Sequence, residues 1–218
     1  MAGVRALTVR HHAARADVAL GALQFMLGWP GGWVPMFVTG GPEAWEFWER
    51  PGAAGAGERV AARVRWLDEE YSAECALGMG RPSFGFGTTT RVGCLWVVVS
   101  GGDQNDRLRR FRPYPSMVLR EGGSSRRTAL WLLERPLHYA DALRANKRIA
   151  YRLRAVQKHA DPDGFVVPCP GSFLRAGRAR PVPIIVTRLV ADSWRSRDLV
   201  GRLKDPPVAD GWRKAVDS

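Results

Sequence analysis

The stretch that decides the fold runs from residue 94 to residue 137, where three short apolar segments alternate with turn residues. They read Cys94-Leu-Trp-Val-Val-Val-Ser-Gly-Gly102, Pro113-Tyr-Pro-Ser-Met-Val-Leu119 and Ser124-Ser-Arg-Arg-Thr-Ala-Leu-Trp-Leu-Leu133. Each contains a run of β-branched, aromatic and other apolar residues bounded by Gly, Pro or Ser, which is typical of β-strands. We therefore expect strands over residues 94–99, 116–119 and 128–133.

Further elements are expected on both sides of this stretch. Strand-like runs lie at residues 33–38, 74–79 and 182–187. Apolar residues recur at helical spacing in residues 13–27, 58–70 and 139–157. Pro42 opens another short segment, with Trp45 and Trp48, which we interpret as a small helix. This order predicts an α+β fold with a largely antiparallel central sheet flanked by helices.

Length and composition indicate one domain with a short tail. The 218 residues suit a single sizeable domain, which we assign to residues 1–192, and the polar residues 193–218 form a C-terminal tail. The apolar runs fall far short of the roughly 20 residues that cross a bilayer, and the N-terminus does not resemble a signal peptide. Cys75, Cys94 and Cys169 are odd in number and widely spaced, which favours reduced thiols. We expect a cytoplasmic protein without a membrane partner.

The positive charge is confined to the second half of the chain. Residues 1–105 hold nine basic and ten acidic residues, whereas residues 106–218 hold 24 basic and 11 acidic ones. Most of the basic residues are arginines, whose planar guanidinium suits phosphate groups. This asymmetry favours contact with nucleic acid. A solvated basic surface or a face for an acidic protein partner remains the alternative.

No common active-site motif occurs in the sequence. A phosphate-binding GxxxxGK[ST] loop, HExxH, GxSxG and a dinucleotide-binding glycine fingerprint after a strand are all absent. The two glycine pairs, at residues 78–80 and 85–87, lack the strand-to-helix context of a nucleotide-binding loop and are expected to form turns. The order of the strand segments therefore carries more information than any single motif.

That order resembles the archaeo-eukaryotic primase superfamily, specifically the prim-pol domains of phage and plasmid replication proteins. Their first pattern is an apolar strand ending in Trp-Val-Asp-x-Asp, to which Leu95-Trp-Val-Val-Val-Ser100 corresponds. A Pro-Ser-led strand follows, here Pro115-Ser-Met-Val-Leu119, and then a Ser/Gly turn and a strand ending in Pro-Leu, here residues 124–137. Asp161 or Asp163 and residues 170–172 correspond to the last motif. The resemblance covers roughly residues 13–190 and implies an RRM-like catalytic-core fold.

The resemblance also implies acids that this chain lacks. In the family, the paired acids of the first strand hold two divalent metal ions for nucleotidyl transfer. The corresponding residues here are Val98 and Ser100, and the family histidine that contacts the incoming nucleotide corresponds to Thr128. Valine cannot bind a hard cation and serine is a poor substitute for a carboxylate. We therefore predict no metal site and no cofactor, with Mg²⁺ or Mn²⁺ needed only if catalysis survives.

The remaining acidic candidates are weak. They are Asp103, Asp106, Asp161 and Asp163. The first two follow the first strand in Gly-Gly-Asp-Gln-Asn-Asp, where they could be displaced metal ligands or ordinary turn residues that cap the backbone.

Two groups of residues are candidates for binding. The turn Ser124, Ser125, Arg126, Arg127 and Thr128 lies where the family grips nucleotide phosphates, although it could equally be an exposed hairpin tip. The second group consists of arginines in a basic cluster and on a basic helix, suited to a nucleic-acid backbone: Arg107, Arg109, Arg110, Arg112, Arg144, Arg148 and Arg152. Phe111 and Tyr114 could stack on bases, or Phe111 could belong to the core.

Three functional hypotheses follow. The first is a catalytically degenerate prim-pol-like protein that binds nucleic acid, as an accessory factor in the replication of a phage, plasmid or related element. The second is an active primase or polymerase that uses displaced acids. The third is a protein-interaction module. The expected partners are DNA or RNA, single-stranded or as template-primer, together with a nucleoside triphosphate and a replication helicase or other replication protein.

Overall fold

The computed structural model describes residues 34–39, 46–49, 54–78, 91–160, 166–175, 178, 180–190 and 192–206. The helix expected over residues 13–27 lies outside them, as do Asp161 and Asp163. Within the described part of the chain, no helix combines the length and the apolar character needed to span a bilayer.

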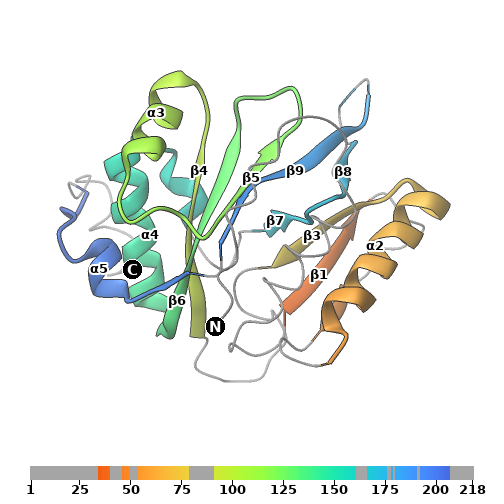
Figure 1. Cartoon of the computed structure of the whole chain (residues 1–218), viewed down its shortest axis with the longest axis horizontal. Helices are drawn as coiled ribbons and strands as arrows, with labels where there is room; N and C mark the ends of the chain where they lie inside the picture. The colour runs from red at the N-terminus through yellow and green to blue at the C-terminus, as the bar shows by residue number, and fades with distance from the viewer. Residues whose placement is uncertain are drawn as a thin grey trace, which may run out of the picture.

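The described strands form two β-sheets, which Figure 1 shows side by side. The larger sheet contains β4 (Arg91–Val99), β5 (Met117–Glu121), β6 (Arg127–His138), β8 (Phe173–Leu174), β9 (Val182–Leu189) and β10 (Ser193–Trp194). The smaller sheet contains β1 (Val34–Thr39), β2 (Glu46–Glu49), β3 (Glu74–Gly78) and β7 (Val166–Pro168). Every described pair is antiparallel except β10 with β6, which is parallel.

The long strand β6 organises the larger sheet. It pairs with β4 over most of its length, while residues 127–130 pair with β5 and residues 132–133 with β10. Strand β9 then pairs with β5 on the far side, and β8 extends the sheet from β9. The three strands expected over residues 94–99, 116–119 and 128–133 therefore lie together in the order β4-β6-β5, and β4 pairs with β6 alone among the described strands.

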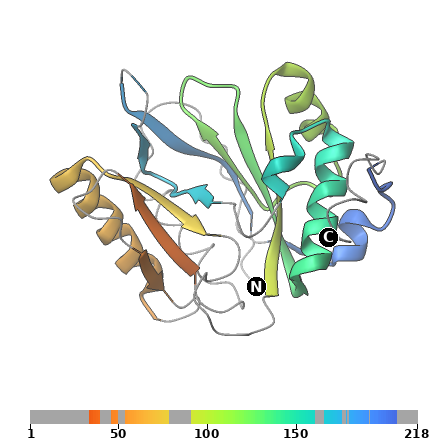
Figure 2. The same cartoon turned by 180° about the vertical axis from the view of Figure 1, so that it is seen from behind.

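The helices lie at two ends of the molecule. Helices α3 (Gly102–Arg110), α4 (Tyr139–Leu153) and α5 (Ser196–Val200) lie together beside β4 and β6, and Figure 2 shows the same grouping from behind. Helix α2 (Ala56–Tyr71) flanks the smaller sheet at the other end. A short 3-10 helix, η1 (Gln157–Ala160), follows α4.

Strand β4 is the most deeply buried strand, and α4 covers its free edge. The apolar residues from Val92 to Val99 are at most 7% exposed. Asn146 of α4 is fully buried, accepts a hydrogen bond from the Trp96 backbone N–H at 3.0 Å and donates one to the Ala160 carbonyl at 3.1 Å. The Trp96 indole N–H also donates to the His159 carbonyl at 2.7 Å. These bonds fix η1 against the strand, because buried backbone groups must find partners.

The α+β class and the antiparallel sheet are confirmed, but two local expectations are wrong. Residues 46–49, expected in the small helix opened by Pro42, form strand β2, because pairing with β1 satisfies their backbone groups. Residues 102–110, expected as a turn and a basic linker, form helix α3. Arginine and glutamine favour helices, and Leu108 buries one side of α3 in the core.

The residues after 192 are not detached from the core. Ser193–Trp194 adds strand β10 to the larger sheet, and Leu199 and Val200 of α5 are 2% and 8% exposed. Arg148 of α4 forms a two-pronged ion pair with Asp205, at 2.6 and 2.8 Å. The segment assigned to the tail therefore packs on α4 and β6 up to residue 206.

Candidate nucleotide and nucleic-acid site

The residues that the sequence resemblance brings together lie side by side on the larger sheet. Thr128 of β6 is flanked by Val98 of β4 on one side and by Leu119 of β5 on the other. Directly paired residues point to the same face of a sheet, so the three side chains share one face. Val98 and Thr128 are 7% and 8% exposed. We call this surface the inner face, because it is turned toward the smaller sheet.

A shallow hollow marks the inner face near the hairpin that joins β5 to β6. Its lining comes from both sheets: Leu119, Arg120, Glu121, Arg126, Thr128, Pro168 and Ile184. A larger hollow of about 540 Å³ lies at the other end of β6, lined by residues such as Glu134, Arg195 and Arg197. It contains none of the candidate residues, whereas the smaller hollow contains Arg126 and Thr128 but, at about 10 Å³, has room for only about one water molecule.

Glu121, which the sequence reasoning missed, is the central charged residue of this hollow. Its side chain is only 12% exposed and forms ion pairs with Arg126 at 3.2 Å and with Arg178 at 3.0 Å. Two guanidinium groups thus neutralise the one carboxylate and leave a net positive charge. Strand alternation was the available signal, since Glu121 lies two residues after Leu119 and so shares its face.

His159 of η1 is a second residue that the sequence reasoning did not select. Burial, together with the nearby charges of Arg126 and Lys158, lowers its pKa, so the imidazole is neutral at neutral pH. The hydrogen bond from Trp96 to the His159 carbonyl holds it in place. A neutral imidazole beside Arg126 can donate a hydrogen bond to a phosphate oxygen.

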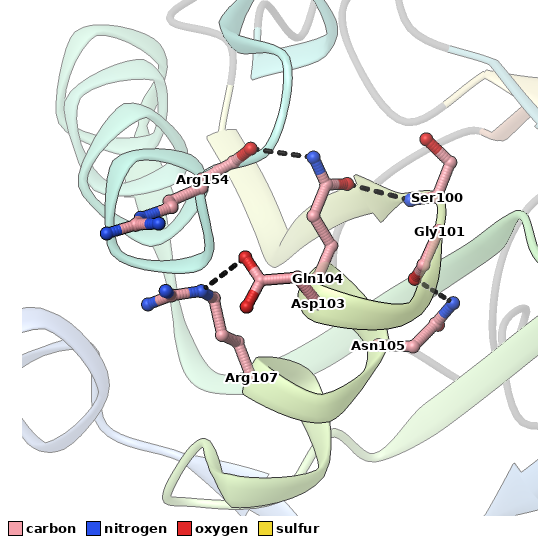
Figure 3. A network of polar contacts seen from close by, with 7 residues as sticks. All are labelled: Ser100, Gly101, Asp103, Gln104, Asn105, Arg107 and Arg154. Carbon is pink, nitrogen blue, oxygen red and sulfur yellow. Dashed lines mark hydrogen bonds and ion pairs between the residues drawn. The ribbon is translucent and has the colours of Figure 1, made fainter.

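A network of neutral groups occupies the segment after β4, where the resemblance predicts the second acid (Figure 3). The Ser100 backbone N–H donates to the Gln104 side-chain oxygen at 2.8 Å, and the Gln104 amide donates to the Arg154 carbonyl at 2.7 Å. Asn105 donates to the Gly101 carbonyl at 2.7 Å. These bonds connect the end of β4 to α3 and to the C-terminal end of α4. None of these contacts involves a carboxylate.

Asp103 and Asp106 point along α3 and do not converge on Ser100. Asp103 is paired with Arg107 at 2.9 Å, and Asp106 with Arg109 at 2.8 Å. The hydrogen bond from Arg107 lowers the pKa of Asp103. In the described residues, no three His, Cys, Asp or Glu side chains gather in a way that could hold a metal ion. The residues present around Val98 and Ser100 therefore do not fit the two divalent ions of the resembled family.

The five residues of the predicted phosphate-binding turn do not converge on one point. Ser124 accepts a hydrogen bond from the Arg126 backbone N–H at 2.9 Å and so caps its own turn. Ser125 accepts one from the Gly101 N–H at 3.0 Å, which connects the hairpin to the start of α3. Arg126 and Thr128 share the inner face, whereas Arg127 points to the opposite face, because side chains alternate along a strand.

The seven arginines predicted to contact nucleic acid differ in whether another side chain already pairs with them. Four pair with an acid: Arg107 with Asp103, Arg109 with Asp106, Arg144 with Asp141 and Arg148 with Asp205. Arg112 lies over the Tyr114 ring at 3.4 Å from its centroid. Arg110 and Arg152 are exposed and have no acidic partner among the described residues. The exposed surface pairs are weak, so a phosphate group can compete for those arginines.

Phe111 and Tyr114 have different roles. Phe111 is 5% exposed and packs edge-on against Trp131, with ring centroids 5.3 Å apart, so it belongs to the core. Tyr114 is 40% exposed, with Arg112 on its ring and Arg188 at 5.2 Å from the centroid. Of the two rings, only that of Tyr114 is accessible to a ligand.

Solved primase structures have a similar fold. The archaeo-eukaryotic primase domain of the cyanophage S-2L primase-polymerase matches with a TM-score of 0.56 and 15% identity, over 88% of this chain and 100% of that one. Primase RepB′ matches with a TM-score of 0.58 and 14% identity, over 84% of this chain and 59% of its own. The catalytic domain of RepB′ in complex with initiator DNA matches with a TM-score of 0.58 and 13% identity, over 83% and 89%.

These matches confirm the resemblance to the archaeo-eukaryotic primase superfamily at the level of the fold. No protein-family model matches the sequence, and no curated protein is significantly similar to it. The chain thus has a fold similar to that of the solved primase domains, at 13–15% sequence identity.

Proposed function

We propose that this protein is a catalytically degenerate prim-pol-like protein that binds nucleic acid and assists the replication of a phage, plasmid or related element. The observation that carries the proposal is the replacement of the metal-binding acid pair by Val98 and Ser100 on a prim-pol fold. Val98 is 7% exposed, and its hydrocarbon side chain has no atom that could coordinate a hard cation.

The charges of the inner face support binding without metal-dependent catalysis. Arg126 and Arg178 outnumber Glu121, and neutral His159 lies nearby. Such a site suits a phosphate group of a nucleoside triphosphate or of a nucleic-acid strand, because guanidinium groups bind phosphate oxygens through two parallel hydrogen bonds. One similar structure, the RepB′ catalytic domain, holds initiator DNA. We extend nucleic-acid binding from that protein to this one.

Two other functions remain as outcomes of the test. An active primase would require ligands from Asp103, Asp106, Asp161 or Asp163, but the first two are engaged by arginines of their own helix. A protein-interaction module would use the same basic surface for an acidic partner. A helicase or other replication protein as partner, and a cytoplasmic location, are further expectations of the proposed role.

Two assays test the proposal together. The first measures fluorescence anisotropy of a labelled single-stranded oligonucleotide as KCl increases, and we expect binding that weakens steeply with salt. The second measures template-dependent primer synthesis with Mg²⁺ or Mn²⁺, and we expect no product. Synthesis that Asp163→Ala abolishes would replace the proposal with an active enzyme, and undetectable DNA and RNA binding at low salt would exclude both.

A matched pair of variants assigns the binding to the inner face. Arg126→Gln removes one of the two guanidinium groups next to Glu121, whereas Arg65→Gln removes an exposed arginine of α2 from the other end of the molecule. We expect Arg126→Gln to weaken triphosphate or strand binding several-fold and Arg65→Gln to leave it unchanged. Equal affinities for both variants would rule out the inner face as the site.

A further inference from the structure

Two arginines face each other on the surface opposite the inner face. Arg120 of β5 and Arg127 of β6 are direct cross-strand partners. Arg120 follows Leu119, and Arg127 precedes Thr128, both residues of the inner face. Because side chains alternate along a strand, both arginines point to the opposite face. Although Arg120 borders the hollow as a neighbour of Leu119 and Glu121, its side chain points away from that face. We call this surface the outer face.

Like charges directly opposite each other destabilise a sheet, and no acid of the described residues pairs with either arginine. Arg109 of α3 adds a third positive charge close enough to influence Arg127. Burial, followed by the charges of Arg109 and Arg120, lowers the pKa of Arg127. The three arginines therefore form a positive cluster in which, among the described residues, only Arg109 has an acidic partner, Asp106.

One N–H of each of the two facing guanidinium groups also lacks a hydrogen-bond acceptor in the described structure. The Nε atoms of Arg120 and Arg127 are buried and have no partner among the described residues. A buried N–H of an ionised group is costly to leave unpaired. An oxygen-rich anion bound by the two guanidinium groups would supply the missing negative charge.

The positive surface continues along the outer face toward Tyr114. Arg188 of β9 is the cross-strand partner of Val118, which lies two residues before Arg120 on β5. Two residues of a strand span about 6.6 Å, so Arg188 is displaced by about that distance along the strands from the pair Arg120 and Arg127. Its Nε–H donates to the Pro115 carbonyl at 2.7 Å, which fixes the guanidinium beside the Tyr114 ring.

We propose that the outer face binds the phosphodiester backbone of a single-stranded nucleic acid, with one phosphate held between Arg120 and Arg127 and the strand continuing past Arg188 and Tyr114. The choice of nucleic acid as the source of the phosphate rests on the proposed function. A chain with regularly spaced anions fits a positive surface that repeats along the sheet, and exposed Tyr114 offers a ring next to it. An acidic protein has no nucleobases that could stack on the Tyr114 ring, which favours a nucleic acid as the ligand.

The outer face is separate from the inner face, so its variants test it independently. The sheet lies between the two surfaces, and Arg126 and Arg127 diverge to opposite sides of it. A strand that contacted both faces would have to pass around the β5–β6 hairpin. The outer face is therefore a second contact and not part of the nucleotide site.

The test compares two double variants in the anisotropy assay with a labelled thymidine oligonucleotide. Arg120→Gln with Arg127→Gln removes the facing pair, and Arg65→Gln with Arg202→Gln removes two exposed arginines elsewhere. We expect the first to weaken binding about tenfold and to reduce the slope of log K against log salt by about 1. The control should retain the wild-type slope.

Thermal unfolding without ligand shows whether the facing arginines have an internal structural role. Removal of two unpaired like charges should leave the melting temperature equal or higher. A drop of several degrees would overturn the proposal, because it would mean that protein groups already satisfy these guanidinium groups. Arg109→Gln, at an exposed helix position, gives a milder variant that should weaken binding two- to fivefold.

The outcomes separate this proposal from the proposed function. If the wild-type protein binds no nucleic acid at low salt, both fail. If it binds and the facing-pair variant keeps the wild-type affinity and slope, only the outer-face proposal fails. If polyglutamate displaces the oligonucleotide at equal charge concentration and the facing-pair variant loses both ligands, the outer face binds an acidic polypeptide and the proposal is wrong.

Discussion

The two faces of the larger sheet use arginine in opposite ways. On the inner face, Glu121 lies between Arg126 and Arg178, so one of the two positive charges is balanced within the protein. On the outer face, Arg120 and Arg127 lie opposite each other without an acid and with unpartnered Nε atoms. A phosphate that binds the inner face must compete with the Glu121 carboxylate for the arginines. On the outer face no acid of the described residues competes for Arg120 or Arg127. The positive charge that a surface offers to a ligand therefore depends more on how its arginines are paired than on their number.

Loss of Asn146 should have the largest effect, because it removes the support of the inner face. Asn146→Ala removes the side chain that pairs with the buried Trp96 N–H and with the Ala160 carbonyl. We expect the free energy of unfolding in urea to fall by about 2–4 kcal/mol. Arg152→Ala, at an exposed position of the same helix, should change it by less than about 0.5 kcal/mol. A loss below about 1 kcal/mol for Asn146→Ala would show that η1 is held by other contacts.

Glu121→Gln should make the inner face resemble the outer one. The substitution leaves two guanidinium groups without their counter-charge, and since both are partly exposed the cost is about 1–2 kcal/mol in urea unfolding. Oligonucleotide affinity should rise at the same time, because a carboxylate no longer competes with phosphate. Glu134→Gln breaks the exposed pair with Arg195 and serves as the control, with little change expected in either measurement. Unchanged affinity for Glu121→Gln would remove the inner face from the binding surface.

Ser125→Ala tests the connection between the β5–β6 hairpin and the start of α3. Its hydroxyl accepts a hydrogen bond from the Gly101 N–H and thereby joins the hairpin to the start of α3. We expect a loss of about 0.5–1 kcal/mol and faster hydrogen exchange at the Gly101 amide. Ser193→Ala, at an exposed position of β10, should leave that amide unchanged. Protection of Gly101 equal to wild type would contradict the connection.

The smallest effect should be the pH dependence that His159 contributes. Its pKa is lower in the folded protein than in the unfolded chain, where the ordinary value is 6.5, so the unfolded chain binds more protons once the pH falls below that value. Stability should therefore decrease as the pH falls through about 6.5, by no more than about 0.5 kcal/mol after allowance for solvent screening. His159→Gln should remove this component from urea midpoints measured between pH 7.5 and 5.5. If the urea midpoint of His159→Gln changed with pH as in the wild-type protein, the pH dependence of stability would belong to another group.

Much of the fold could be predicted from local patterns in the chain. The apolar segments at residues 94–99, 116–119 and 128–133 appear as β4, β5 and β6, and the periodic segments at residues 58–70 and 139–157 appear as α2 and α4. Burial imposes a period of two or of 3.6 on these segments, so the pattern is visible without a partner. Where local preference was weak, as at residues 46–49, pairing with another strand decided the structure.

The candidate site was harder to predict, because its residues come from separate segments. The correspondence of Val98, Ser100 and Thr128 with the family pattern located the end of β4 correctly. Glu121 and Arg178 are separated by a long stretch of chain, and no periodicity connects them. The division of the turn between Arg126 and Arg127 follows from strand alternation, but only after the register of β6 is known.

The sequence alone determined the α+β class, the order of the six strands that it predicted, the basic second half and the absence of acids at Val98 and Ser100. These properties depend on the residues themselves and on periodicities within single segments. The tertiary structure decided which arginines are neutralised and which are free, because an ion pair depends on the distance between groups from different elements. It also decided that neighbouring Arg126 and Arg127 serve opposite faces. The sequence therefore predicted a basic surface. The fold divided it into an inner face, where Glu121 partly neutralises the arginines, and an outer face, where no described acid pairs with Arg120 or Arg127.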